Sequence, residues 1–152
     1  MKILHILYQS IPNTAGSSIR SRDVINSQLA EGLMPIVITS PFQAPLVKGE
    51  KEDIIEGVRY YRTFSGKESE LVSEQKTGIV KQIRKAIRLV TFTVRVYKIA
   101  KKEKVDILHA HAMFFCAIAA RITSILQNKP MLYEIRSLWE ERYKNKNIFS
   151  NI

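Results

Sequence analysis

The chain has 152 residues, of which 45% are hydrophobic and 25% charged, and a formal net charge of +10. This length suits one domain with a real core, and the composition excludes a disordered chain. The apolar runs are far shorter than the roughly 20 residues that span a bilayer, no cleaved signal peptide is recognisable, and a single cysteine, Cys116, excludes an intramolecular disulfide and suits a reducing cytoplasm.

The first half of the chain predicts three strands and one helix. The strands are short apolar runs, at 2–8, 35–40 and 58–64, the last an edge strand because it carries two arginines. The helix is capped by Ser17 or Ser18 and stopped by Gly32. Its partial inward face comprises Ile19, Val24, Ile25, Gln28 and Leu29. Residues 41–57 are predicted to be loop.

The second half predicts two helices and two strands, and a polar tail follows from Ser137. The helices are expected at 77–103 and, buried by its small residues, at 112–127; the strands are expected at 105–111 and 131–136. Strand and helix alternate, and Asn-Gly or Asp-Gly hairpin signals are absent from the sequence. This pattern predicts an α/β, Rossmann-like three-layer domain, with a mostly parallel sheet and helices on both faces.

Ligands of such sheets bind beyond the carboxyl ends of the strands, which selects three stretches. The first, residues 9–23, lacks the G-x-G-x-x-G pattern, so a dinucleotide-binding fingerprint is excluded. Arg20 and Arg22 are predicted in the first helical turn, where cations oppose the helix dipole. That cost favours a ligand role, such as clamping an anionic group. The alternative is that both arginines simply face solvent.

The second stretch, "VDILHAHAMFFC", contains two of the three histidines. Alternation along a strand places His109 and His111 on one face. A metal would need a further ligand, and the remaining candidates, His5 and Cys116, show no ligand spacing, so no metal is predicted. His109 is expected to be buried and structural, whereas His111, at the strand end, is expected to face the crevice and donate a hydrogen bond to substrate.

The third stretch, residues 133–142, places Glu134 and Arg136 on one face at the end of a strand, with Glu140 and Glu141 following. A glutamate among arginines commonly forms a salt bridge. At a crevice edge the same carboxylate could orient a substrate hydroxyl or act as a base.

The segment 76–104 concentrates ten basic residues against one acid. An apolar row is predicted to pack on the sheet, comprising Ile79, Ile83, Ile87, Val90, Val94 and Tyr97. A second apolar row borders the cations, comprising Leu89, Phe92, Val96 and Ile99. The predicted docking surface comprises Lys81, Arg84, Arg88, Phe92, Arg95 and Lys98. An anionic membrane, a protein partner and plain solvent remain alternatives; nucleic acid is not expected, because no recognition motif is present.

Three blocks, in this order, resemble family-4 glycosyltransferases of the GT-B fold: residues 1–41, "VDILHAHAMFFCAIAARI" and "PMLYEIRSLWEER". The resemblance covers nearly the whole chain. It implies a retaining transferase that moves a sugar from a nucleotide-sugar to an acceptor in a cleft between two Rossmann-like domains. Residues 1–152 would be the amino-terminal, acceptor-side domain, and the carboxyl-terminal nucleotide-sugar-binding domain, with its Glu-x7-Glu motif, is expected to be missing.

The resemblance also implies roles for single residues. Gly16 would lie near the donor phosphates, Arg20 and Arg22 would meet donor or acceptor, and His111 would contact the transferred sugar. Glu134 and Arg136 match cleft-edge positions. The sequence departs from many relatives in having Ala15 before Gly16 where they have two glycines, which affects close phosphate approach at residue 15.

The expected function is therefore half of a glycosyltransferase for surface polysaccharide or glycolipid synthesis, inactive alone and requiring no metal or cofactor. Its expected partners are the missing domain, a sugar or lipid-linked acceptor, and an anionic membrane surface. The expected location is cytoplasmic, peripheral at the inner face of the plasma membrane. The alternative is a non-catalytic Rossmann-like module that binds an anionic membrane or a protein partner.

Overall fold

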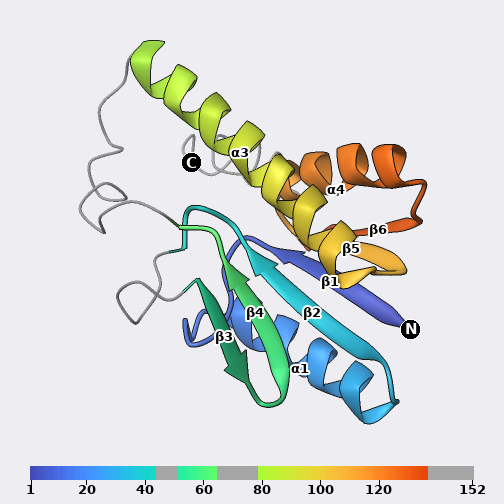
Figure 1. Cartoon of the computed structure of the whole chain (residues 1–152). Coiled ribbons are helices and arrows are strands. Elements are labelled where there is room, and N and C mark those ends of the chain that lie inside the picture. The colour runs from blue at the N-terminus through green and yellow to red at the C-terminus, as the bar shows by residue number, and fades with distance from the viewer. Residues whose placement is uncertain (44–50, 65–78, 137–152) are drawn as a thin grey trace, which may run out of the picture.

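The protein folds around one six-stranded, mostly parallel sheet (Figure 1). The computed structural model describes residues 1–43, 51–64 and 79–136. The strand order is β3-β4-β2-β1-β5-β6. The strands are β1 (Lys2–Leu7), β2 (Met34–Thr39), β3 (Glu52–Ile55), β4 (Val58–Arg62), β5 (Ile107–His111) and β6 (Met131–Glu134), and the helices are α1 (Gly16–Ala30), α3 (Ile79–Glu103) and α4 (Phe114–Gln127). The predicted α/β, Rossmann-like class is confirmed.

Helix α1 covers one face of the sheet, and α3 and α4 cover the other (Figure 1). The larger core lies under α3 and α4, where Leu4 and Ile6 of β1 pack with Phe92 and Val96. The smaller core, around Ile25 and Val37, lies on the α1 face. Because strand side chains alternate, His5 of β1 points to the α1 face.

The loop predicted over 41–57 contains a strand that the sequence analysis missed. β3 pairs antiparallel with β4. The two strands are joined by Glu56 and Gly57, whose φ angles are 52° and 80°. Two successive positive φ values are the mark of a hairpin turn whose twist matches the strands. β3 is therefore the edge, and β4, predicted as an edge, lies between β3 and β2. Residues 44–50 lie outside the described part.

Helix α1 begins and packs differently from the prediction. Its N-cap is Ala15, which offers no side-chain cap, so neither Ser17 nor Ser18 caps it. Gly32, with φ 77°, ends it as predicted. The buried positions are Ser18, Ser21 and Ile25, whereas Ile19 and Leu29 are exposed. Of the predicted inward face, Ile25 is buried as expected, and two serines occupy the other buried positions.

The predicted orientation of the long helix is wrong. Phe92, Val96 and Ala100 of α3 are buried in the larger core, together with Ile99, which is partly buried. The row expected to pack is exposed instead: Ile83, Ile87, Val90 and Val94 have 56%, 58%, 62% and 45% of their area accessible. Tyr97 is half-buried, and the side chain of Ile79 lies outside the described set.

Helix α4 is buried on one face only, not throughout as predicted. Cys116, Ala119, Ala120 and Thr123 face the core. The opposite face exposes large apolar side chains, those of Phe114, Ile118, Ile122, Ile125 and Leu126. Small residues on the inner face let the helix approach the sheet closely.

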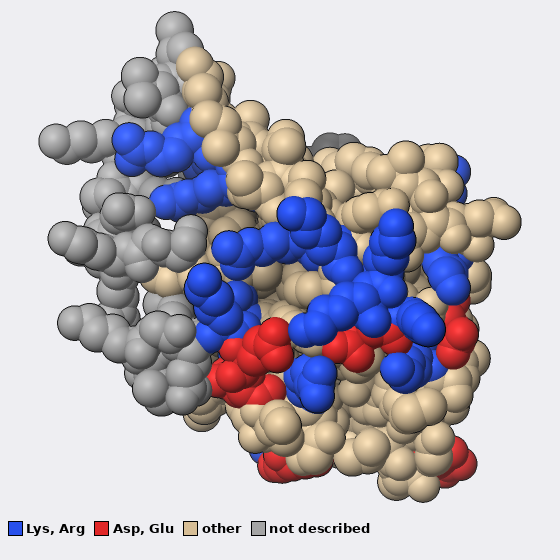
Figure 2. Space-filling view, in the orientation of Figure 1, with Lys and Arg blue, Asp and Glu red and all other residues tan. Residues whose placement is uncertain are grey.

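The basic surface gathers over α3. Figure 2 shows a band of Lys and Arg beside an area without charged residues. Arg84 and Lys98 are exposed, whereas Lys102 is paired with Glu52 at 3.5 Å. Phe92 was predicted to be part of the docking surface, but it is buried in the core and cannot contribute to that surface. The side chain of Lys81 lies outside the described set. Among the helices of the described ranges, none is long and apolar enough to cross a bilayer.

Candidate functional site

The sheet changes direction of winding between β1 and β5. From β1 the chain builds outward through β2 to β4, and α3 then brings it back to β5 on the other side of β1. In open α/β sheets the crevice at this switch point, beyond the carboxyl ends of the strands, is where ligands bind. The loop after β1, the end of β5 and the end of β6 meet there.

Three histidines lie together on the α1 face of this region. His5 and His109 are register partners of β1 and β5, and His111 follows on the same face. The ring centroids of His109 and His111 are 3.9 Å apart, and that of His5 is 5.0 Å from His109. All three side chains are buried. The structure thus does not separate a buried His109 from a cleft-facing His111; His111, at 1% exposure, is the more enclosed of the two.

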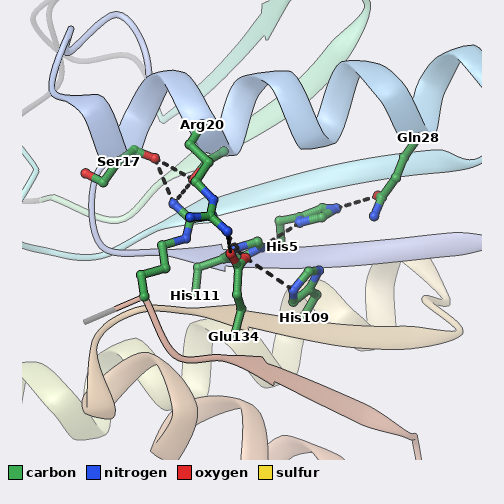
Figure 3. A network of polar contacts seen from close by, with 9 residues as sticks. His5, Ser17, Arg20, Gln28, His109, His111 and Glu134 are labelled. Carbon is green, nitrogen blue, oxygen red and sulfur yellow. Dashed lines mark hydrogen bonds and ion pairs between the residues drawn. The ribbon is translucent and has the colours of Figure 1, made fainter. Parts of the chain in front are cut away.

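A chain of polar contacts runs through these rings from α1 to the end of β6 (Figure 3). His5 Nε2 is 2.8 Å from Gln28 Oε1, and His5 Nδ1 is 2.9 Å from His111 Nε2. His111 Nδ1 is 2.8 Å from Glu134 Oε2. The β5–β6 register, which pairs His111 with Glu134, produces the last contact.

Two arginines hold the Glu134 carboxylate from opposite sides. Arg20 Nη2 of α1 is 3.0 Å from Oε1, and Arg136 Nη2 is 3.2 Å from Oε2. Arg136 also donates to the carbonyl of Ser17 and to Ser21 Oγ, each at 2.8 Å. These bonds fasten the end of β6 to the first turns of α1. Glu134 and Arg136 therefore share a face, as predicted, and Arg20 joins them.

Burial keeps the three histidines neutral. Desolvation is the main cause that lowers the pKa of His5 to about 4, although the hydrogen bond to Gln28 opposes it. Desolvation, followed by the neighbouring histidines, lowers the pKa of His111 to about 2. Burial also lowers the pKa of His109. Each ring therefore carries one proton at neutral pH, and one nitrogen of each is an acceptor.

The other predicted residues lie in different places. Gly16 begins α1, and a methyl group added there would meet no atom within 4 Å. Arg20 is in the second turn of α1, not the first, and its side chain is 63% exposed. Arg22 pairs with its neighbour Asp23 at 2.9 Å and does not join the Glu134 cluster. Glu140 and Glu141 lie outside the described residues.

An apolar cleft of about 370 Å³ opens near the carboxyl ends of β1, β2 and β5, on the α3 side. Its aromatic lining consists of Tyr8, Phe42, Phe92, Phe114 and Phe115. Lys85 also lines it, and the Arg88 guanidinium lies 5.9 Å from the centre of the Phe42 ring. The aromatic walls can thus receive the apolar part of a ligand, and Lys85 and Arg88 can attract a negatively charged group on the same ligand.

Sequence reasoning missed His5 and Gln28 as members of the site. It considered His5 as a metal ligand and dismissed it for lack of spacing. The position of the strands offered a signal. In a sheet whose first strand is central, β1 and β5 are neighbours, so residues of the two strands that point to the same face lie side by side. Cys116, the other candidate considered, belongs to the core on the opposite face.

Comparisons with known proteins show the fold. No family model matches the chain, and no curated protein matches it in sequence. MurG from Acinetobacter baumannii, a GT-B glycosyltransferase, superposes with a TM-score of 0.58 at 12% identity over 95% of this chain and 38% of that one. UDP-GlcNAc 2-epimerase from Methanocaldococcus jannaschii gives 0.47 at 13% over 88% and 31%. The chain thus spans about a third of each of these two proteins.

A third similar structure is the carboxyl-terminal domain of the PF1911 hydrogenase from Pyrococcus furiosus. Its TM-score is 0.53 at 14% identity, over 87% of this chain and 89% of that one. The fold is therefore GT-B-like and Rossmann-like, and it occurs in proteins of different names. Function has to be argued from the site.

Proposed function

We propose that this chain is the amino-terminal, acceptor-side domain of a retaining family-4 glycosyltransferase that uses a nucleotide-sugar in surface polysaccharide or glycolipid synthesis. In this proposal residues 1–152 are inactive without a carboxyl-terminal donor-binding domain. The observation that carries the proposal is the Glu134 carboxylate, held between Arg20 and Arg136 at the switch-point end of the sheet. The three ordered sequence blocks and the superposition on MurG support it.

The charges of this edge suit a nucleotide-sugar. Its diphosphate is anionic, and the amino terminus of α1 carries partial positive charge. Arg20 adds a guanidinium whose side chain is mostly exposed. Gly16 leaves the backbone of the helix start open, so that a phosphate of a donor bound by the second domain could approach it.

Glu134 is the group that would touch the acceptor. Its side chain is 22% exposed, so one edge is available to an acceptor hydroxyl. An ionised carboxylate accepts hydrogen bonds, and here it would orient the hydroxyl for attack on the sugar. His111 lies behind Glu134, and its ring nitrogens are within hydrogen-bond distance of His5, Glu134 and Arg136. In this proposal His111 positions Glu134, and the contact with the transferred sugar that the resemblance implies stays a prediction.

The apolar cleft supports the glycolipid branch of the proposal. A lipid-linked acceptor joins a hydrocarbon chain to a phosphate, and the cleft offers aromatic walls with Lys85 in its lining and Arg88 at Phe42. Burial of apolar surface against these walls would favour binding by about 25 cal/mol per Å².

The proposal is tested with the chain alone and with the chain joined to the carboxyl-terminal domain. Each is incubated with labelled UDP- and GDP-sugars and a lipid extract. Only the joined protein is expected to transfer sugar, with the anomeric configuration of the donor kept in the product, as read by NMR. A joined protein that neither hydrolyses nor transfers any of these sugars would refute the proposal.

Substitution of Gly16 by alanine should separate catalysis from stability. The added methyl meets open space, so the free energy of unfolding should be unchanged or rise by up to about 1 kcal/mol, since alanine is the better helix former. The methyl should also obstruct phosphate approach, and kcat/KM of the joined protein should fall at least about tenfold, a change of about 1.4 kcal/mol.

Gly57→Ala is the matched control. Gly57 has φ 80°, so alanine there costs about 1–2 kcal/mol of stability, while the kinetics of the folded protein should not change. Unaltered kcat/KM in Gly16→Ala would remove Gly16 from the donor site.

A second function, binding to an anionic membrane surface, is favoured by the exposed row of α3. Ile83, Ile87, Val90 and Val94 are exposed beside Arg84. An apolar row next to a basic one is the pattern of helices that lie on anionic bilayers. This function would also hold for a non-catalytic module, the alternative reading of the sequence.

Reversal of two charges on this surface should weaken membrane binding. Arg84→Glu with Lys98→Glu should lower the partition into vesicles of phosphatidylglycerol and phosphatidylcholine by about 30-fold or more, because each cation contributes about 1 kcal/mol. Sedimentation with vesicles measures it. Arg22→Glu with Lys51→Glu changes the net charge equally and should have little effect. Equal losses in both variants would argue for unspecific charge attraction. If the wild type does not bind these vesicles at all, the membrane proposal is wrong.

A further inference from the structure

The three histidines of the chain form one cluster. The sequence has no others, and one ring nitrogen of each lies within 4.8 Å of the others. The cluster follows from strand pairing and alternation. His5 of β1 is the register partner of His109 of β5, and the His-x-His spacing places His111 on the same face of the sheet as His109. A buried group of three imidazoles is an unusual choice for a core, because each ring has two polar atoms to satisfy.

The outer nitrogens of two rings face acceptors. His5 Nε2 lies 2.8 Å from the Gln28 carbonyl oxygen, and His111 Nδ1 lies 2.8 Å from a Glu134 carboxylate oxygen. In one of the two possible tautomer states, both outer nitrogens carry the proton and donate to these acceptors. A neutral imidazole has only one proton, so the inner nitrogens, His5 Nδ1 and His111 Nε2, both present lone pairs. They are 2.9 Å apart, where two lone pairs repel unless a cation is shared between them.

The third ring has a buried nitrogen without a hydrogen bond. His109 Nε2 has no partner within the described part of the chain, and its distance to Glu134 Oε2 is 3.8 Å. An unsatisfied buried polar atom costs about 1–3 kcal/mol. In that tautomer state the cluster combines two acceptor nitrogens that face each other, on His5 and His111, with a His109 nitrogen that has no hydrogen bond.

We propose that His5, His109 and His111 bind one transition-metal ion of the Zn²⁺ class, each through a ring nitrogen, with Gln28 and Glu134 orienting two of the rings from outside. Imidazole nitrogens suit Zn²⁺, Co²⁺ and Ni²⁺. A ring N–H donated to a carboxylate or carbonyl is the usual outer contact of a metal-binding histidine. The proposal is independent of sugar transfer, and its tests need no activity assay.

The required adjustment differs between the nitrogen pairs, and a pair that lies 4.8 Å apart, the upper limit in the cluster, would have to close by about 1.5 Å. Zn–N bonds of about 2.0–2.1 Å at tetrahedral angles place two nitrogens about 3.3 Å apart, so the present 2.9 Å must widen by a few tenths of an ångström. His109 and His111, stacked with an interplanar angle of 29°, must rotate so that both ring planes contain the ion.

One contact opposes the metal and defines the competing state. Arg136 Nη2 is 2.7 Å from His111 Nδ1, which suits an unprotonated Nδ1 and places the proton on Nε2, toward His5. In the metal-bound state Arg136 keeps its bonds to Glu134, Ser17 and Ser21 and moves away from His111. The two states thus differ in the tautomer of His111.

The test uses the tag-free, metal-free chain titrated with Zn²⁺ and with Co²⁺. One ion per chain is expected, with intense visible Co²⁺ absorption of a tetrahedral site. His109→Ala should abolish saturable binding. Gln28→Leu should weaken it by about 10- to 100-fold, whereas Gln28→Glu, which keeps an acceptor, should restore it. Asn26→Leu, on the same helix, is the matched control and should leave the affinity unchanged.

Three results would overturn the proposal: no saturable binding by the wild type, equal affinity in His109→Ala, or equal affinity in Gln28→Leu and Asn26→Leu. Circular dichroism establishes that each variant is folded. If His109→Ala does not fold, the Gln28 pair and the nitrogen-15 histidine spectrum decide, because metal must place the His111 proton on Nδ1. A metal-loaded chain with that proton on Nε2 would also refute the site.

Discussion

Replacement of Phe92 by alanine is expected to lower the free energy of unfolding by about 3–5 kcal/mol. The side chain is 1% exposed and packs in the larger core with Leu4 and Ile6. Removal of the ring takes apolar area out of the core and leaves a cavity that neighbouring strands cannot close. Urea denaturation followed by circular dichroism measures the change.

Ile87→Ala on the same helix is the control. Ile87 is 58% exposed, so its truncation should change stability by no more than about 0.5 kcal/mol. The pair decides which row of α3 faces the sheet. A large loss at Ile87 with little loss at Phe92 would restore the orientation predicted from the sequence.

Substitution of Arg62 by methionine should cost about 3–5 kcal/mol, the usual result of breaking a buried ion pair. The Arg62 side chain is 3% exposed and its Nε is 2.7 Å from Asp53 Oδ2. It also donates to Ser10 Oγ at 2.6 Å and to the Ile11 carbonyl at 2.9 Å. Methionine fills similar space but leaves these acceptors without their donor.

Arg59→Met, three residues away on β4, is the matched change. Arg59 pairs with Glu103 at 3.3 Å, but its side chain is 46% exposed, so about 1 kcal/mol or less is expected. The same urea titration measures both variants. Similar losses at the two positions would mean that the contacts of Arg62 with Asp53, Ser10 and Ile11 stabilise the fold no more than the exposed Arg59 pair does.

The strands and the fold class were predictable because short apolar runs in alternation with helices leave few architectures. The β3–β4 hairpin was not, since its turn is Glu56-Gly57 and lacks the Asn-Gly and Asp-Gly signals that predict a two-residue hairpin turn. The facing of α3 could not be decided, because the helix has two apolar rows and the sequence does not state which one the sheet receives. Only packing makes that choice.

In the candidate site, too, some contacts could be predicted from the sequence and others could not. The face shared by Glu134 and Arg136 followed from alternation along one strand. The His5–His109 pairing depends on which strands are neighbours, and the Arg20–Glu134 ion pair on the angle at which α1 crosses the sheet. These are relations between elements distant in sequence, and local patterns contain no information on them.

The length of α3 has a consequence for how evenly the molecule is held together. Its 25 residues extend about 37 Å at 1.5 Å per residue, whereas a six-residue strand such as β1 covers only about 20 Å. Figure 1 shows the amino-terminal turns extending past the sheet. The buried anchors begin at Phe92. Backbone amides before that residue should therefore open and exchange hydrogen in local fluctuations, while those near Val96 and Ala100 exchange only in larger unfolding events. A partner surface that covered Ile83 and Ile87 would slow hydrogen exchange only at the amides before Phe92. Binding at this end of α3 would therefore appear as slower exchange in the first turns of the helix, with no change in its helical content.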